Sequence, residues 1–260
     1  MPEWLTVVLL GIIEGITEFL PISSTGHLLI AQKWLPRQSD LFNIVIQSAA
    51  VIAVIPLFRH RVNQVLFHWK ESATQQFIFK IAGAFFLTGV GGLLLDRAGF
   101  ELPETVIPVA AALLIGGILF LVVERFVAGK PKAEDITWTV AIAIGIAQLI
   151  AAVFPGASRS GTTIIIAMIL GLSRPAATEF SFLVGIPTML AAGGLKIFDQ
   201  ISEPTAPAED WSMLALGCIV SAVVSFIAVK WLLHFVQGHT FDSFGIYRII
   251  LAVVLLFVLY

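Results

Sequence analysis

Residues 14–27 read Glu-Gly-Ile-Thr-Glu-Phe-Leu-Pro-Ile-Ser-Ser-Thr-Gly-His, and they interrupt an apolar region that runs from about residue 4 to residue 31. A second apolar region, 137–172, is interrupted in the same way by Pro155-Gly-Ala-Ser-Arg-Ser-Gly161. Proline removes a helix donor and clashes with the preceding turn. Each region should therefore form two half-helices, a broken re-entrant hairpin that dips into the membrane.

The composition around the two breaks is that of a membrane protein. Of the 260 residues, 58% are hydrophobic, 12% are charged, and a further 21 are glycine. With glycine included the apolar share is roughly two-thirds, against about 45–50% for a soluble domain. A net charge of −2 gives no reason to expect a nucleic-acid partner, and the single Cys218 cannot form a disulfide within the chain. We therefore expect a polytopic α-helical membrane protein.

Six further apolar stretches approach the roughly 20 residues that cross a bilayer. They are 41–58, 77–96, 105–124, 180–198, 211–236 and 246–260. Between the first two, residues 62–73 combine apolar and basic side chains at helical spacing, which predicts an amphipathic helix in the interface.

The two breaks are copies of each other. Three pairs of residues match at a constant offset of 134, namely Gly11 with Gly145, Ile16 with Ile150 and Pro21 with Pro155. Residues 1–130 and 131–260 are thus expected to be two membrane repeats, each a broken hairpin followed by three transmembrane helices. An odd number of spans turns the second copy over, so we predict an all-α integral membrane fold with an inverted-topology repeat.

Basic residues orient this arrangement. If the loops after residues 58, 124 and 236 are cytoplasmic, that side holds Arg59, Arg61, Lys70, Lys80, Arg125, Lys130, Lys132, Arg174, Lys230 and Arg248. The other side holds Lys33, Arg37, Arg97 and Lys196. An excess of ten to four favours this orientation, since cytoplasmic loops are enriched in lysine and arginine.

Ionisable residues inside a membrane are expensive and mark function by default. Glu14 and Glu18 share one face of the first half-helix, and two such carboxylates cannot both stay ionised without help. They need a shared proton, a cationic side chain or a divalent cation (Mg²⁺ or Ca²⁺) that also binds substrate phosphate oxygens. A purely structural pair is the alternative. The second repeat has Gln148 and Ala152 at these places, so the two halves have different tasks.

The residues after each break suit an anion, because a helix start leaves N–H groups unpaired and carries positive potential. The candidate phosphate-binding residues are Ser23, Ser24, Thr25, Gly26, Ser158, Ser160 and Gly161. Simple helix capping by the serines is the alternative. Arg159 should clamp phosphate oxygens or act as a counterion to Glu14 or Glu18. His27 could transfer a proton or cap a helix.

The two quoted motifs, with Gly171-Leu-Ser-Arg and Glu179-Phe-Ser-Phe after the second, resemble the signatures of the undecaprenyl-diphosphate phosphatase family, also called bacitracin resistance proteins. The resemblance covers the whole chain. It implies a multi-pass enzyme of the bacterial inner membrane that removes the terminal phosphate from a C55 polyprenyl diphosphate and so recycles the lipid carrier of peptidoglycan synthesis. It also implies bacitracin resistance.

The same resemblance implies roles for individual residues. Glu14 and Glu18 match the acidic motif, Arg159 the phosphate-binding arginine, and Ser24 or His27 the nucleophile, with Ser24 our choice. We expect a divalent cation on the two glutamates, attack by Ser24, and Glu18 or His27 as base. Direct attack by water is the alternative, with Ser24 only a ligand.

Two other functions are alternatives to this phosphatase. An inverted-repeat lipid flippase or secondary transporter would share the architecture, but the loss of both glutamates from the second half favours a one-sided chemical site. A histidine-dependent lipid phosphatase would need histidine and aspartate where Ile165 and Ile169 stand. The expected partners are the polyprenyl diphosphate and membrane lipids, with a homodimer left open.

Overall fold

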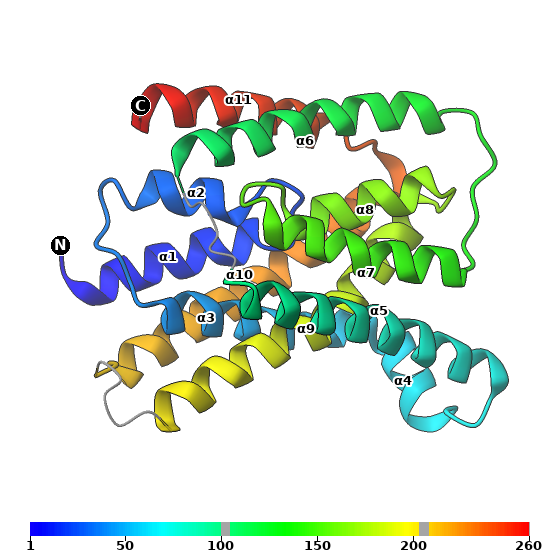
Figure 1. Cartoon of the computed structure of the whole chain (residues 1–260), viewed down its shortest axis with the longest axis horizontal. Coiled ribbons are helices and arrows are strands. Elements are labelled where there is room, and N and C mark those ends of the chain that lie inside the picture. Colours follow the sequence, from blue (N-terminus) through cyan, green and yellow to red (C-terminus); the bar gives the residue numbers. More distant parts are fainter. Residues whose placement is uncertain (100–104, 203–207, 260) are drawn as a thin grey trace.

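A computed structural model describes residues 1–99, 105–202 and 208–259 (Figure 1). These residues form helices joined by short links, with one isolated β-bridge between Ala133 and Leu172. The helices are α1 (Glu3–Thr17), α2 (Ser24–Ala31), α3 (Asp40–Val54), the 3₁₀ helix η1 (Ile55–Phe58), α4 (Arg59–Phe67), α5 (Ser72–Arg97), α6 (Val106–Val127), α7 (Trp138–Val153), α8 (Arg159–Ile169), α9 (Arg174–Ser202), α10 (Trp211–Gly238) and α11 (Asp242–Leu259).

The six predicted spans are confirmed as helices long and apolar enough to cross a membrane. Within the described residues they are α3 continued through η1 and α4, then α5, α6, α9, α10 and α11. Their large apolar side chains are widely exposed, as with Phe79 and Phe86 on α5, which suits contact with lipid tails. The protein is a multi-pass membrane protein. The end of the predicted span 246–260, Tyr260, lies outside the described residues.

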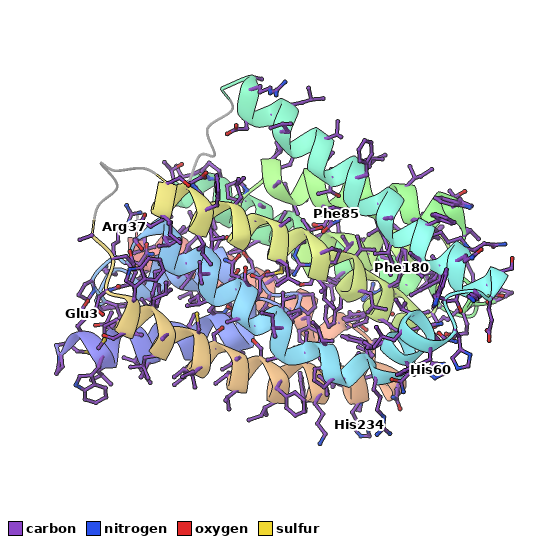
Figure 2. The ribbon with its side chains drawn as sticks, turned by 90° about the horizontal axis from the view of Figure 1, so that it is seen from below. Glu3, Arg37, His60, Phe85, Phe180 and His234 are labelled. Carbon is purple, nitrogen blue, oxygen red and sulfur yellow. The ribbon has the colours of Figure 1, made fainter. Side chains whose placement is uncertain are left out.

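Polar residues lie at both ends of the helical bundle. In Figure 2, Glu3 and Arg37 lie at one end of the molecule and His60 lies at the other, with the apolar helices between them. The start of α1 and the end of α11 lie at the same end of the chain's long axis (Figure 1). That arrangement fits helices whose axes run across a bilayer.

Both predicted helix breaks are present. A link of residues 18–23 separates α1 from α2, and a link of residues 154–158 separates α7 from α8. Each link ends on a serine with positive φ, 71° at Ser23 and 68° at Ser158, a conformation that non-glycine residues rarely adopt. Each of these serines caps the helix that follows, because its Oγ accepts from the N–H of Gly26 or of Gly161.

The two broken hairpins, α1–α2 and α7–α8, pack on neighbouring helices in the same pattern. α1 packs on α10 while α7 packs on α5, and α2 packs on α11 while α8 packs on α6. Small residues allow close approach at both of the first two contacts: Ser225 on α10 donates to the carbonyl of Gly15 at 3.0 Å, and Thr88 on α5 donates to that of Gly145 at 3.1 Å. The links are thereby surrounded by helices from both halves of the chain.

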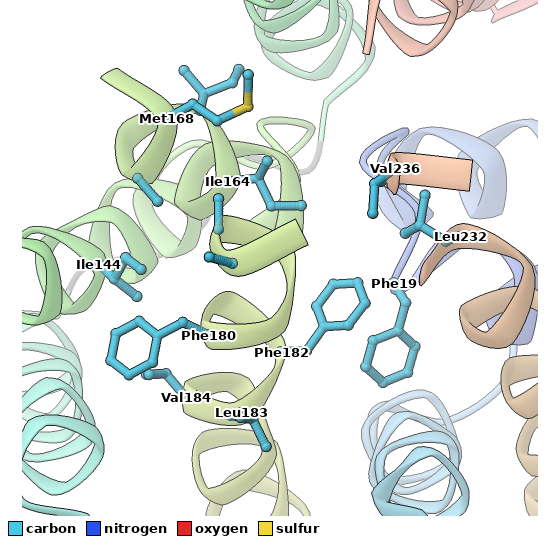
Figure 3. Close-up of a cluster of buried hydrophobic side chains, with 14 of the residues drawn as sticks. Phe19, Ile144, Ile164, Met168, Phe180, Phe182, Leu183, Val184, Leu232 and Val236 are labelled. Carbon is cyan, nitrogen blue, oxygen red and sulfur yellow. The ribbon is translucent and has the colours of Figure 1, made fainter. Parts of the chain in front are cut away.

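A large apolar core supports the links from one side (Figure 3). Phe19, in the first link, is fully buried and meets Phe182 of α9 edge-on, with ring centroids 5.2 Å apart. Ile144 and Ile164 extend this cluster onto α7 and α8, and Leu232 extends it onto α10. Burying Phe19 fixes the segment that carries Glu18.

Two predictions about charged segments were wrong. The amphipathic helix expected over 62–73 is shorter and starts earlier, because α4 spans Arg59–Phe67 and residues 68–71 form a turn before α5. Arg248, counted among the cytoplasmic basic residues, is fully buried and hydrogen-bonded inside the bundle. It therefore says nothing about orientation, and the excess of basic residues becomes nine to four.

Candidate active site

A cavity of about 270 Å³ lies where the two links meet. Six of the predicted site residues line it: Glu18, Ser23, Ser24, Thr25, Ser158 and Arg159. Helices α3, α5, α7 and α9 contribute the remaining polar wall, with Gln47, Thr88, Gln148 and Thr188. Residues more than 130 positions apart in the sequence therefore face one small space, as the duplicated breaks predicted.

Glu18 joins the two links through a chain of hydrogen bonds. The Oγ of Ser24 donates to Oε2 of Glu18 at 2.9 Å, and Nη2 of Arg159 donates to Oε1 at 3.2 Å. The Glu18 side chain is only 9% exposed and that of Arg159 only 16%. A hydroxyl, a carboxylate and a guanidinium in a poorly solvated space interact far more strongly than they would in water.

Arg159 has binding capacity left over. Its Nη2 also contacts the sulfur of Met189, a weak acceptor, at 2.8 Å. Its Nη1 is buried and has no hydrogen-bond partner among the described residues. The guanidinium is seated against Gly185 of α9, where a Cβ would overlap Nη1. The guanidinium therefore keeps one donor nitrogen that the described residues leave unused.

The helix starts offer further donors. The first N–H groups of α2 and α8, those of Ser24, Thr25, Arg159 and Ser160, precede the first intrahelical bonds. The N–H groups of Gly26 and Gly161 are occupied by the capping serines. Ser160 is fully buried and links the two halves, since its Oγ donates to the carbonyl of Leu20 at 3.3 Å. Its side chain thus binds the first link directly.

Glu14 lies one helical turn before Glu18 and is fully buried. Both of its carboxylate oxygens lack a normal hydrogen-bond partner in the described part of the chain, and its polar neighbours are Glu18 and Gln47. A buried, unpaired carboxylate calls for a proton or a cation. Together with Glu18 and the side chain of Gln47, it forms a polar set whose carboxylate oxygens fit a hard divalent cation.

The protein ligands alone would leave such a cation incompletely coordinated. Among residues 1–99, 105–202 and 208–259, no group of three or more His, Cys, Asp or Glu side chains assembles. The fit is therefore to an ion that takes further oxygens from phosphate groups or water, as Mg²⁺ commonly does.

His27 is held away from Ser24 by two other partners. One ring nitrogen lies 2.7 Å from the carbonyl of Ser23, and the other lies 2.7 Å from the hydroxyl of Tyr247 on α11. A carbonyl can only accept, so Nδ1 carries the proton and Nε2 accepts from the tyrosine hydroxyl. This tautomer occupies both ring nitrogens, and the proton acceptor hydrogen-bonded to Ser24 is Glu18.

Sequence reasoning missed several residues of the site. Gln47, Thr88, Thr188 and Tyr247 were not among the predicted site residues. Gln148 was noted only as the counterpart of Glu14, yet its Nε2 donates to Thr88 at 3.0 Å on the cavity wall. For Gln47, Thr88 and Thr188, the available signal was a polar side chain within an apolar span.

Comparison of the sequence with known proteins shows the family of this chain. The family model described as bacitracin resistance protein BacA matches residues 7–254. The chain belongs to the BacA family. A protein of Rhizobium etli (strain CIAT 652) named undecaprenyl-diphosphatase is 51% identical over 255 residues, 98% of this chain and 96% of the relative. One of Xanthomonas campestris pv. campestris (strain 8004) with the same name is 48% identical over 257 residues, 98% of each chain. The resemblance drawn from the two motifs is confirmed.

Proposed function

We propose that this BacA-family chain hydrolyses undecaprenyl diphosphate to undecaprenyl phosphate and phosphate in a bacterial inner membrane. The names of the relatives supply the substrate. The observation that supports the chemistry is the Ser24–Glu18–Arg159 chain at 2.9 and 3.2 Å, since a nucleophile must lie within hydrogen-bond reach of its base.

Substrate binding would rearrange the charges in the cavity. The diphosphate would place its oxygens at the starts of α2 and α8 and on the unused Nη1 of Arg159, while its prenyl chain stays in lipid. Phosphate oxygens would compete with Glu18 for the guanidinium. A carboxylate that loses this partner becomes a better proton acceptor, so binding itself would activate Glu18.

In the first step, Ser24 Oγ attacks the terminal phosphorus and its proton passes to Glu18. The bond between that phosphorus and the bridging oxygen breaks, and undecaprenyl phosphate leaves as an anion. Arg159 and the helix N–H groups stabilise the charge that develops on the phosphoryl oxygens.

In the second step, water attacks the phosphoserine. The Oγ–P bond breaks, Glu18 returns its proton to Oγ, and the proton lost by water leaves with the phosphate product. Direct attack by water, with Ser24 as a ligand, is the competing route. His27 is the alternative nucleophile, but its hydrogen bonds to Ser23 and Tyr247 support a positioning role instead.

Glu14 and Glu18, with Gln47, would hold the divalent cation, Mg²⁺ or Ca²⁺. When bound, it would neutralise charge on the diphosphate and its leaving group.

The membrane arrangement is part of the proposal. The twofold packing scheme supports residues 1–130 and 131–260 as inverted repeats, with α1–α2 and α7–α8 as re-entrant hairpins entering from opposite faces. Recycling of the lipid carrier would confer bacitracin resistance, as the family description suggests. The homodimer stays a prediction.

The deciding experiment is phosphate release from a polyprenyl diphosphate by detergent-purified protein, with and without chelator. Ser24→Ala should abolish release, and Ser39→Ala, which removes a serine hydroxyl at the start of α3 and outside the cavity, should not. Release that survives Ser24→Ala would move the attack to water or His27. Absence of release with every divalent cation tested would reject the phosphatase in favour of a transporter.

A further inference from the structure

Arg248 on α11 is a buried cation without an anionic partner. Its side chain is fully buried, and the ion pairs of the described residues do not include it. An arginine in such a place is expensive unless its donors are satisfied. Here backbone carbonyls accept from both terminal nitrogens, while Nε has no hydrogen-bond partner among the described residues. The role of Arg248 therefore depends on where these carbonyls lie.

The carbonyls belong to both links. Nη1 of Arg248 donates to Pro21 at 3.2 Å, in the link before α2. Nη2 donates at 3.0 Å to both Gly156 and Ala157, in the link before α8, and at 3.2 Å to Ala112 of α6. One guanidinium therefore holds two segments that come from different halves of the chain.

These contacts lie next to the most strained backbone in the site. The carbonyl of Ala157 belongs to the peptide that enters Ser158, and Pro21 is two residues before Ser23. Both serines have positive φ, a conformation that persists only where its surroundings hold it. Fixing the adjacent carbonyls supplies that constraint.

We propose that Arg248 is a positioning residue for the phosphatase reaction. It does not line the cavity, so it acts through the two links rather than on the substrate. By holding Pro21 and Ala157 on one planar group, it sets the separation between the Ser24–Glu18 pair and Arg159. This inference deepens the proposed function and depends on it for its kinetic test.

Gly116 of α6 makes the guanidinium's place available. A Cβ there would overlap Nη2 of Arg248 and come 2.8 Å from Cζ. Gly116→Ala should therefore displace the guanidinium while leaving the arginine in the chain. Two independent substitutions, Gly116→Ala and Arg248→Met, thus disturb the same contacts.

The kinetic test measures kcat and KM for phosphate release. Arg248→Met and Gly116→Ala should each lower kcat about tenfold or more, because misplacing reacting groups by about 1 Å can cost about 100-fold. KM should change less than about threefold. Arg248→Lys should give an intermediate kcat, since an ammonium can satisfy some of the carbonyls. The double variant should be no worse than the more impaired single variant, because both remove one set of contacts.

Arg174→Met is the matched control. Arg174 is a partly buried arginine, paired with Glu124 away from the cavity, so its loss should lower thermal stability without changing the kcat of the folded protein. If Arg174→Met loses as much kcat as Arg248→Met at matched folded fractions, the effect is general destabilisation and the proposal is rejected.

Backbone hydrogen exchange tests the same idea without activity. Amides of residues 22–26 and 157–161 should exchange faster in both the Arg248→Met and Gly116→Ala proteins, but not in Arg174→Met. If Arg248→Met does not fold, Gly116→Ala alone decides. Unchanged exchange in the links would overturn the proposal, even if the wild-type chain is an active phosphatase. Faster exchange in a chain that releases no phosphate would keep the positioning role and reject the proposed reaction.

Discussion

Gly185 on α9 offers a direct test of where Arg159 must lie. A Cβ at this position would overlap Nη1 of Arg159 and come 2.9 Å from Cζ, and its three nearest heavy atoms all belong to that guanidinium. The group in the way is the far end of a flexible side chain. Gly185→Ala should therefore move the arginine and leave the helix in place.

The expected loss of kcat is large for the addition of one methyl group. Displacing the guanidinium removes a preorganised donor to the developing phosphoryl charge, which is worth about 2.7–4 kcal/mol, or about 100- to 1,000-fold in kcat. Alanine also favours the helix over glycine by roughly 1 kcal/mol, which offsets part of the stability lost when the guanidinium leaves Glu18. Arg159→Ala should lower kcat by at least the same factor.

The assay is phosphate release together with thermal unfolding in detergent. Gly194→Ala is the control, because a Cβ at that glycine of the same helix meets no atom within 4 Å. A Gly185→Ala enzyme within about twofold of wild-type kcat would refute the role assigned to Arg159, since the guanidinium could then act from another position.

Three further predictions concern the cavity and its support. Glu18→Gln should lower kcat about 100-fold or more, the usual contribution of a general base, and should abolish stimulation by divalent cations; titration with Mg²⁺ after chelation checks this, and a fully metal-responsive variant would exclude Glu18 as a ligand. Tyr247→Phe removes one hydrogen bond to His27, worth about 0.5–1.5 kcal/mol, so kcat should fall by at most about tenfold, and a loss of 1,000-fold or more would instead make the histidine a catalytic residue. Glu124→Gln removes the charge of a buried carboxylate that pairs with the partly buried Arg174, and it should destabilise the protein by about 1.5–3 kcal/mol; a thermal midpoint equal to that of wild type would contradict this.

The local features of the site were predictable because their causes are local. Pro21 and Pro155 break helices wherever they occur within an apolar run, and serine before glycine caps the next helix. Both breaks lie where the sequence predicted them. The six spans followed from hydropathy. However, α9 begins at Arg174, before the predicted residue 180, because Arg174 and Glu179 lower the hydropathy of its first turns while Ala177 packs in the core.

The contacts that hold the links together could not be predicted in this way. Arg248 stands near the start of an apolar stretch, where a basic residue usually marks a membrane surface. Only the packing of α11 on α6 and α2 shows that it points inward. Tyr247 beside it is partly exposed, and its hydrogen bond to His27 could not be predicted from the sequence either. Partners separated by more than 200 residues leave no periodic pattern in a single sequence.

Arg159 and Arg248 each depend on a neighbouring glycine for space, and this limits the order in which substitutions can accumulate in the family. Each guanidinium is accommodated against a glycine of another helix, Arg159 against Gly185 and Arg248 against Gly116. A lineage that first replaces the glycine displaces an arginine still under selection. A lineage that first loses the arginine can then replace the glycine by a larger residue without a clash. Substitutions within each pair should therefore occur in one order, with the arginine lost before its glycine changes.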